Sequence, residues 1–238
     1  MRVFFFFSIL FFFFYKYIIY LFIFYCLIII NNWWRDVTRE STYIRFHSPI
    51  VKKNIYFGII LFIISEIFFF FGFFWTFFHS SLSLSVDLIN WPPIRIYTFN
   101  PLRVPFLNTI VLLSSRFTIT WSHYEFLSNN FYYCFWGIIL TIILRIFFTF
   151  LQLIEYNEST YCFNDSVFGS IFFLRTRFHR FHVLIRTIFL IISIIRLING
   201  HFNKNNHVRL ECSIWYWHFV DVVWIFLYLF FYWWRRNL

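Results

Sequence analysis

The feature that most constrains this chain is a series of six apolar runs, each long enough to cross a bilayer as a helix. A helix rises about 1.5 Å per residue, so about 20 apolar residues match a hydrocarbon core of about 30 Å. The runs are Val3–Ile30, Asn54–His79, Val104–Trp121, Phe131–Ile154, Val167–Asn199 and Glu211–Trp234. Because backbone polar groups must be satisfied inside the membrane, the runs predict an all-α, polytopic transmembrane helical bundle with six spans.

The composition excludes a soluble domain. The 238 residues are 61% hydrophobic and include 42 Phe, which is more apolar surface than one core can bury. The segments between the runs are too short for a water-soluble catalytic domain, so the chain acts in or at the bilayer. Four cysteines stand singly without a CxxC motif, which predicts neither a disulfide framework nor a zinc site: Cys26, Cys134, Cys162 and Cys212.

The last apolar run carries two ionisable residues, His218 and Asp221. Such groups cost about 2.5 to 3.5 kcal/mol at membrane depth, so we expect them to face protein rather than lipid. Because they are three residues apart, they share one helix face. The run is flanked by aromatic residues that prefer the membrane interface, namely Trp215, Trp217, Trp233 and Trp234.

The string Trp-Tyr-Trp-His-Phe-Val-Asp-Val-Val-Trp at 215–224 closely resembles the last transmembrane helix of the cytochrome c oxidase subunit III family. The resemblance continues upstream in Trp-Trp-Arg-Asp at 33–36 and in the Phe-rich string from Ser65 to Trp75, and covers nearly everything from Trp33 onward. The family usually has seven helices, so we expect the first to be missing from this sequence. The resemblance implies a core subunit of respiratory complex IV in the mitochondrial inner membrane, beside catalytic subunit 1, with haem and copper held by partner subunits.

The runs divide the chain into an N-terminal transmembrane helix (1–30), a matrix-side loop (31–53) and a five-helix bundle (54–238). The loops expected on one side carry basic residues: Arg35, Arg39, Lys52, Lys53 and Lys204. The loops expected on the other side carry acidic residues: Asp87, Glu155, Glu158 and Asp165. The positive-inside rule then places the basic loops in the matrix.

Three residues of the first loop, Trp34, Glu40 and His47, admit two interpretations. From physics alone they belong to a solvated interfacial loop with aromatic anchors. The resemblance implies instead that they line a bound phospholipid, whose headgroup suits basic, aromatic and hydrogen-bonding groups. Arg196 and His201, at the end of the fifth run, correspond to basic residues that contact lipid headgroups in the family.

Glu66 lies near the middle of the second run among apolar residues, with no cation beside it in sequence. Desolvation favours the neutral carboxyl, so we expect Glu66 to be protonated and reactive toward a hydrophobic carbodiimide. A role in proton handling and a hydrogen bond to a neighbouring helix both remain open.

His179 and His182 are one helical turn apart, a spacing that can ligate a metal or haem. No further ligand stands nearby in sequence, so interhelical hydrogen bonding is the favoured interpretation. We expect no catalytic residue, no metal ligand and no nucleic-acid partner. The alternative function is a proton-coupled transporter or channel that uses Glu66, His179 and His182, but the sequence shows neither an inverted repeat nor paired broken helices.

Ten arginines stand where the family has glycine or another small residue, several of them inside predicted spans: Arg45, Arg95, Arg116, Arg145, Arg175, Arg177, Arg180, Arg186, Arg209 and Arg235. Small residues are what close helix packing needs. Some mitochondrial codes read AGA and AGG as glycine and ATA as methionine, and this sequence has 1 Met. Glycine at the ten positions would leave 10 basic residues (20 minus 10) against 10 acidic ones, so no partner is inferred from basicity. The other interpretation is a true set of arginines paired with lipid phosphates or with acidic subunits.

Overall fold

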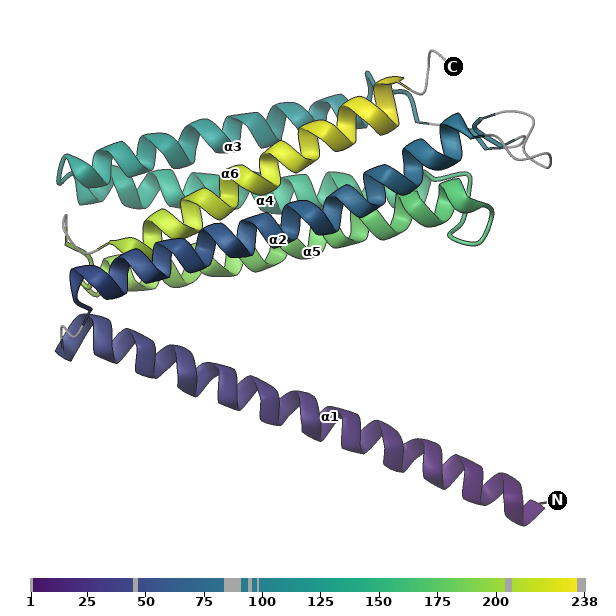
Figure 1. Ribbon diagram of the computed structural model, residues 1–238, viewed down its shortest axis with the longest axis horizontal. Helices are drawn as coiled ribbons and strands as arrows, with labels where there is room; N and C mark the ends of the chain where they lie inside the picture. Colours follow the sequence, from purple (N-terminus) through teal and green to yellow (C-terminus); the bar gives the residue numbers. More distant parts are fainter. Residues whose placement is uncertain are drawn as a thin grey trace. The chain divides into compact units, whose positions relative to one another are not determined.

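The computed structural model describes residues 2–44, 47–83, 91–93, 96–97, 99–203 and 207–234. Helices make up almost all of the regular structure in these ranges (Figure 1). They are α1 (Arg2–Arg39), a π-helix (Glu40–Ile44), α2 (Pro49–Leu82), α3 (Val104–Leu127), α4 (Phe131–Glu158), α5 (Val167–Ile198), and α6 (Val208–Tyr228) with its π-helical continuation (Leu229–Trp233). The predicted all-α membrane bundle is confirmed.

Five of these helices are long and apolar enough to cross a membrane, and the helix that falls short in apolarity is α3. At 24 residues it has the necessary length. Polar residues in α3, among them Asn108, Ser115 and Ser122, lower its apolarity. These three side chains are buried against neighbouring helices and not turned outward. The third predicted run is therefore a helix as expected, with polar residues on its packed face.

The chain forms two compact units, Met1–Asn54 and Ile55–Leu238. In the first unit, the prediction of a loop from residue 31 to 53 was wrong over much of its length, since α1 continues to Arg39 and α2 begins at Pro49. Residues 31–44 include neither Gly nor Pro, so nothing in them stops the helix early. The Ser41 hydroxyl donates to the Thr38 carbonyl oxygen (3.0 Å) where α1 passes into the π-helix.

Residues Glu155 and Glu158 were also predicted to lie in a loop, and both belong to α4. Glu155 is almost fully buried and accepts hydrogen bonds from Asn108 Nδ2 (3.2 Å) and the Tyr232 hydroxyl (3.3 Å). Partners from α3 and the end of the last helix thus draw this carboxyl into the bundle. Asp87, Lys204, Arg45, Arg95 and Arg235 fall outside the described residues.

In the second unit, α3 and α4 form an antiparallel pair joined by a short turn (Figure 1). A Cβ at Gly137 would lie 2.8 Å from Ser122 Cβ, so only glycine allows the two helices to approach this closely. Across the same contact, the hydroxyls of Thr118 and Thr141 are 3.0 Å apart. In the turn, Asn129 adopts a left-handed conformation with φ of 69°.

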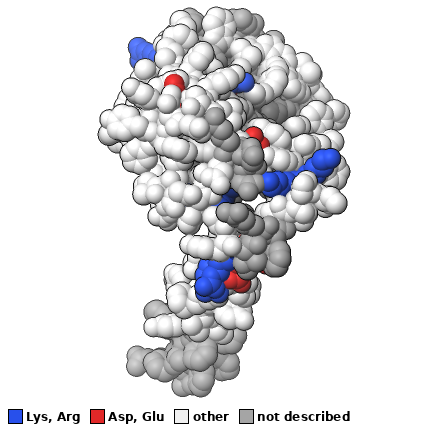
Figure 2. All heavy atoms as spheres, turned by 90° about the vertical axis from the view of Figure 1, so that its left-hand side faces the viewer, with Lys and Arg blue, Asp and Glu red and all other residues white. Residues whose placement is uncertain are grey.

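The sixth helix supplies much of the core. Trp217 and Trp224 of α6 are fully buried, and the Trp224 ring meets Phe148 of α4 edge-on at 4.9 Å. Charged groups are sparse on the outside. Figure 2 looks at the end where α2 begins and α5 ends, and shows isolated Lys and Arg side chains with fewer Asp and Glu among uncharged residues.

Candidate functional site

A line of hydrogen-bonding side chains joins three helices in the second unit. Glu66 of α2 lies with its Oε2 3.2 Å from Nε2 of His182 on α5. The other ring nitrogen of His182, Nδ1, is 2.7 Å from the hydroxyl of Tyr216 on α6. His182 and Tyr216 are buried, while the side chain of Glu66 keeps 17% of its surface exposed. One carboxyl, one imidazole and one phenol can therefore share protons across α2, α5 and α6.

This line exists because each helix turns a polar residue toward the same point. His179 and His182 share one face of α5, and that face packs against α6. His179 is fully buried, with Nε2 3.4 Å from the Val220 carbonyl oxygen and its ring 5.0 Å from that of Trp224. The two histidines thus contact different partners across helix interfaces, and their side chains do not converge on a common metal position.

Asp221, five residues after Tyr216 on α6, is fully buried between two arginines. Its Oδ1 is 2.5 Å from Nη2 of Arg145 on α4 and 2.8 Å from Nη1 of Arg186 on α5. Both guanidinium carbons lie 4.4 Å from the ring centroid of Trp217. His218, predicted on the same face, is only half-buried. As written, the sequence places two cations on one carboxylate oxygen in a buried position, which is an uncommon arrangement.

The other arginines at positions predicted to hold small residues differ in how far they are buried. Arg175 is fully buried, and its guanidinium carbon lies 2.9 Å from the Phe231 ring centroid. That distance is shorter than the 3.5 to 4.0 Å or so of an ordinary carbon–carbon contact. Four more are partly or fully exposed on their helices: Arg116, Arg177, Arg180 and Arg209. Arg145, Arg175 and Arg186 are thus enclosed by neighbouring side chains, whereas the other four are not.

The five residues predicted to bind lipid fall in both units. In the first unit, Trp34 and Glu40 are exposed and His47 is partly buried. In the second, Arg196 is partly buried with its guanidinium carbon 4.9 Å from the Phe202 ring, and His201 follows the end of α5. Their convergence on one phospholipid remains a prediction.

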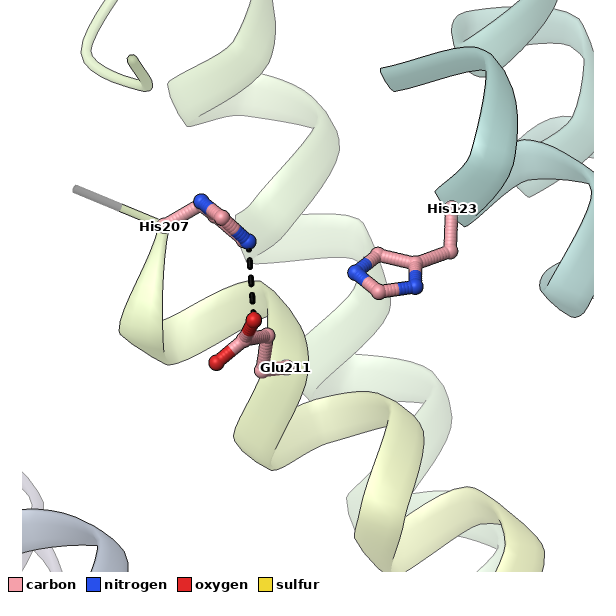
Figure 3. Close-up of side chains that lie close together, drawn as sticks. All are labelled: His123, His207 and Glu211. Atoms are coloured by element: carbon pink, nitrogen blue, oxygen red, sulfur yellow. Dashed lines mark ion pairs between the residues drawn. The ribbon is translucent and has the colours of Figure 1, made fainter. Parts of the chain in front are cut away.

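One cluster was not predicted from the sequence. His123 near the end of α3 and His207 and Glu211 at the start of α6 bring their ligand atoms within 4.8 Å of one another (Figure 3). His207 Nε2 is 2.9 Å from Glu211 Oε1, and the Tyr56 hydroxyl of α2 donates to Glu211 Oε2. The four-residue spacing of His207 and Glu211 was visible in the sequence, whereas the approach of His123 depends on how α3 packs against α6.

Comparison with known proteins agrees with a multi-span membrane protein. The sequence profile of cytochrome c oxidase subunit III matches residues 3–236. Relatives include cytochrome c oxidase subunit 3 of Drosophila melanogaster, 50% identical over 203 residues that make up 85% of this chain and 78% of the relative. The same subunit of Osphranter robustus and of Loxodonta africana is 49% identical over the same shares. This chain is therefore a member of the cytochrome c oxidase subunit III family.

Proposed function

We propose that the chain is a core, non-redox subunit of cytochrome c oxidase, the proton-translocating complex that transfers electrons from cytochrome c to oxygen. The observation that carries this proposal is the family match over residues 3–236, supported by helices that suit a multi-span membrane subunit. The setting is the mitochondrial inner membrane, with haem and copper held by partner subunits and catalytic subunit 1 as the neighbour.

The role of the chain within the complex is to hold structural phospholipid and to support proton uptake and enzyme stability. Support for lipid binding comes from α2, whose buried residues are only Phe70, Phe77 and Ser81 among the 34 it contains. Most of its apolar surface is left for acyl chains or for another subunit. Support for proton handling comes from Glu66, whose carboxyl contacts an imidazole within a helix long and apolar enough to cross a membrane.

Purification tests the assignment to the oxidase. Membranes are solubilised in mild detergent and fractionated, and the chain is followed by peptide mass spectrometry alongside haem absorbance. The chain should elute with the haem absorbance at a constant ratio through successive columns. Elution in haem-free fractions would contradict the proposal and favour the proton-coupled transporter or channel.

Lipid retention tests the second part. The double variant Arg196→Gln, His201→Asn should lose tightly bound phospholipid from the purified complex, measured as phosphorus per haem. Arg103→Gln removes one exposed cation just before α3, at the other end of the bundle, and should retain the lipid. Equal phospholipid content in both variants would refute the assignment of Arg196 and His201 to a headgroup site.

A further inference from the structure

We propose that His123, His207 and Glu211 form a binding site for a divalent transition metal, with Zn²⁺ as the best match, which ties α3 to α6. The potential ligand atoms lie within 4.8 Å of one another and come from two helices distant in sequence. Figure 3 shows a ring nitrogen of His123 pointing toward His207 and Glu211 across the gap between the helices. This proposal does not depend on the proposed function.

The two imidazoles are poorly satisfied without a metal. His207 keeps only 9% of its surface exposed, and its Nδ1 has no hydrogen-bond partner among the described residues. The same holds for Nε2 of His123, which is also shielded from solvent. Buried polar nitrogens normally have partners, and burying one without a partner costs free energy. A metal ion that accepts the lone pair of His123 Nε2 would remove that cost at His123, and on His207 the ion would bind Nε2, the nitrogen that faces Glu211.

The donor set indicates which metals fit. Two imidazole nitrogens and one carboxylate oxygen are ligands typical of zinc, whereas calcium and magnesium prefer oxygen ligands alone. Tetrahedral zinc with bonds of about 2.0 to 2.2 Å places its ligand atoms about 3.3 to 3.5 Å apart. His207 and Glu211 are already 2.9 Å apart, so the main adjustment is an approach of the His123 ring by about 1.5 Å at most.

The surroundings hold the carboxylate in place. The hydroxyl of Tyr56 donates a hydrogen bond to Glu211 Oε2, which leaves Oε1 directed at His207. The Tyr56 ring lies 5.2 Å from that of Trp215, one turn further along α6. Hydrogen bonds that fix a ligating carboxylate tune metal affinity in known sites. A bound ion would therefore connect α3 and α6 directly and α2 through Tyr56.

Metal content of the native complex tests the proposal. The purified complex that contains the chain is treated with chelator, dialysed, equilibrated with Zn²⁺ and analysed by inductively coupled plasma mass spectrometry. The variants His207→Asn and Glu211→Gln should bind one Zn²⁺ fewer per complex than the unmodified chain. His79→Asn is the control, because it removes an exposed histidine outside the cluster, and it should bind as much Zn²⁺ as the unmodified chain. Equal zinc content in all four complexes would overturn the proposal.

A second measurement needs no variant and keeps the test decisive if a variant fails to assemble. Diethyl pyrocarbonate modifies exposed imidazoles quickly and buried ones as local opening exposes them, and the modified residues are located by peptide mass spectrometry. Zn²⁺ should slow the modification of His123 and His207 at least tenfold while leaving the exposed His79 unchanged. If Zn²⁺ fails to slow the modification of His123 and His207, or slows that of His79 to the same extent, the cluster is not a metal site.

Discussion

The contact between Glu66 and His182 gives a quantitative prediction for carbodiimide labelling. A neutral Glu66 donates its proton to Nε2 of His182 over 3.2 Å, and Nδ1–H then donates to the Tyr216 oxygen over 2.7 Å. The reagent reacts with the free protonated carboxyl, so this hydrogen bond must open before labelling. Replacing His182 with leucine removes the bond and leaves the Glu66 carboxyl without this partner.

The size of the effect follows from the strength of such bonds in membranes. Side-chain hydrogen bonds between transmembrane helices contribute about 0.6 kcal/mol on average and about 1.7 kcal/mol at most. Since about 1.36 kcal/mol is a factor of ten, the labelling rate of Glu66 should rise about 3-fold to 18-fold in His182→Leu.

The assay is the pseudo-first-order rate of label incorporation into the peptide that contains Glu66, measured on the purified complex. Ser65→Ala is the matched control, because the Ser65 hydroxyl bonds to the Phe62 carbonyl of its own helix (2.7 Å) and does not touch His182. The control should keep the unmodified rate. An equal or lower rate in His182→Leu, or labelling confined to exposed carboxyls such as Glu40 in both proteins, would refute the reasoning.

Three further predictions concern packing, topology and the arginines. Gly137→Ala should lower the free energy of unfolding by about 1 to 3 kcal/mol, because the added Cβ meets Ser122 Cβ. Gly72→Ala, whose added Cβ has no atom within 4 Å, should leave the melting temperature unchanged or raise it. Equal melting temperatures for the two variants would contradict this. The exposed Cys162 should react with a membrane-impermeant maleimide added to the intermembrane-space side of mitoplasts. A Cys162 that does not react from that side would contradict the predicted topology. Peptide mass spectrometry across Phe173–Phe189 should find glycine masses at the four arginine positions, whereas arginine masses with tryptic cleavage would refute the codon explanation.

The sequence predicted the helices well because hydrophobic length and transmembrane structure are directly linked. The predicted runs at Phe131–Ile154 and Val167–Asn199 differ from α4 and α5 by a few residues at most. The predicted helix boundaries were wrong where polar residues continue a helix beyond its apolar run. Residues 31–44 of the first loop contain no Gly or Pro to stop a helix. The carboxyl of Glu155 is satisfied by buried partners that only the fold brings together.

The candidate sites were predictable one residue at a time and not as groups. Glu66, His182 and Asp221 stand out as ionisable residues in apolar runs, so each was expected to contact protein. Their pairing depends on helix rotation and crossing, which local periodicity does not encode. The same holds for His123, since 84 residues separate it from His207 (207 minus 123) and only the packing of α3 against α6 makes them neighbours.

The buried arginines show where local sequence and fold disagree. Arg145, Arg175 and Arg186 occupy positions that the helices close over almost completely. Breaking or leaving unpaired a buried charge costs about 3 to 5 kcal/mol, and Asp221 is shared between two of these cations. Small residues at these positions would remove both cations from Asp221 and the close contact of Arg175 with Phe231, which is why the peptide masses at these sites are informative.

Native mass spectrometry of the intact complex tests the central claim most directly, because it reports partner subunits and bound lipid in one spectrum. We predict that this chain is found in a complex that also contains the haem-bearing subunit of cytochrome c oxidase, and that activation releases phospholipid together with the chain. A complex of this chain that lacks the haem-bearing subunit would contradict the assignment to the oxidase, and the absence of retained phospholipid would contradict its proposed structural role.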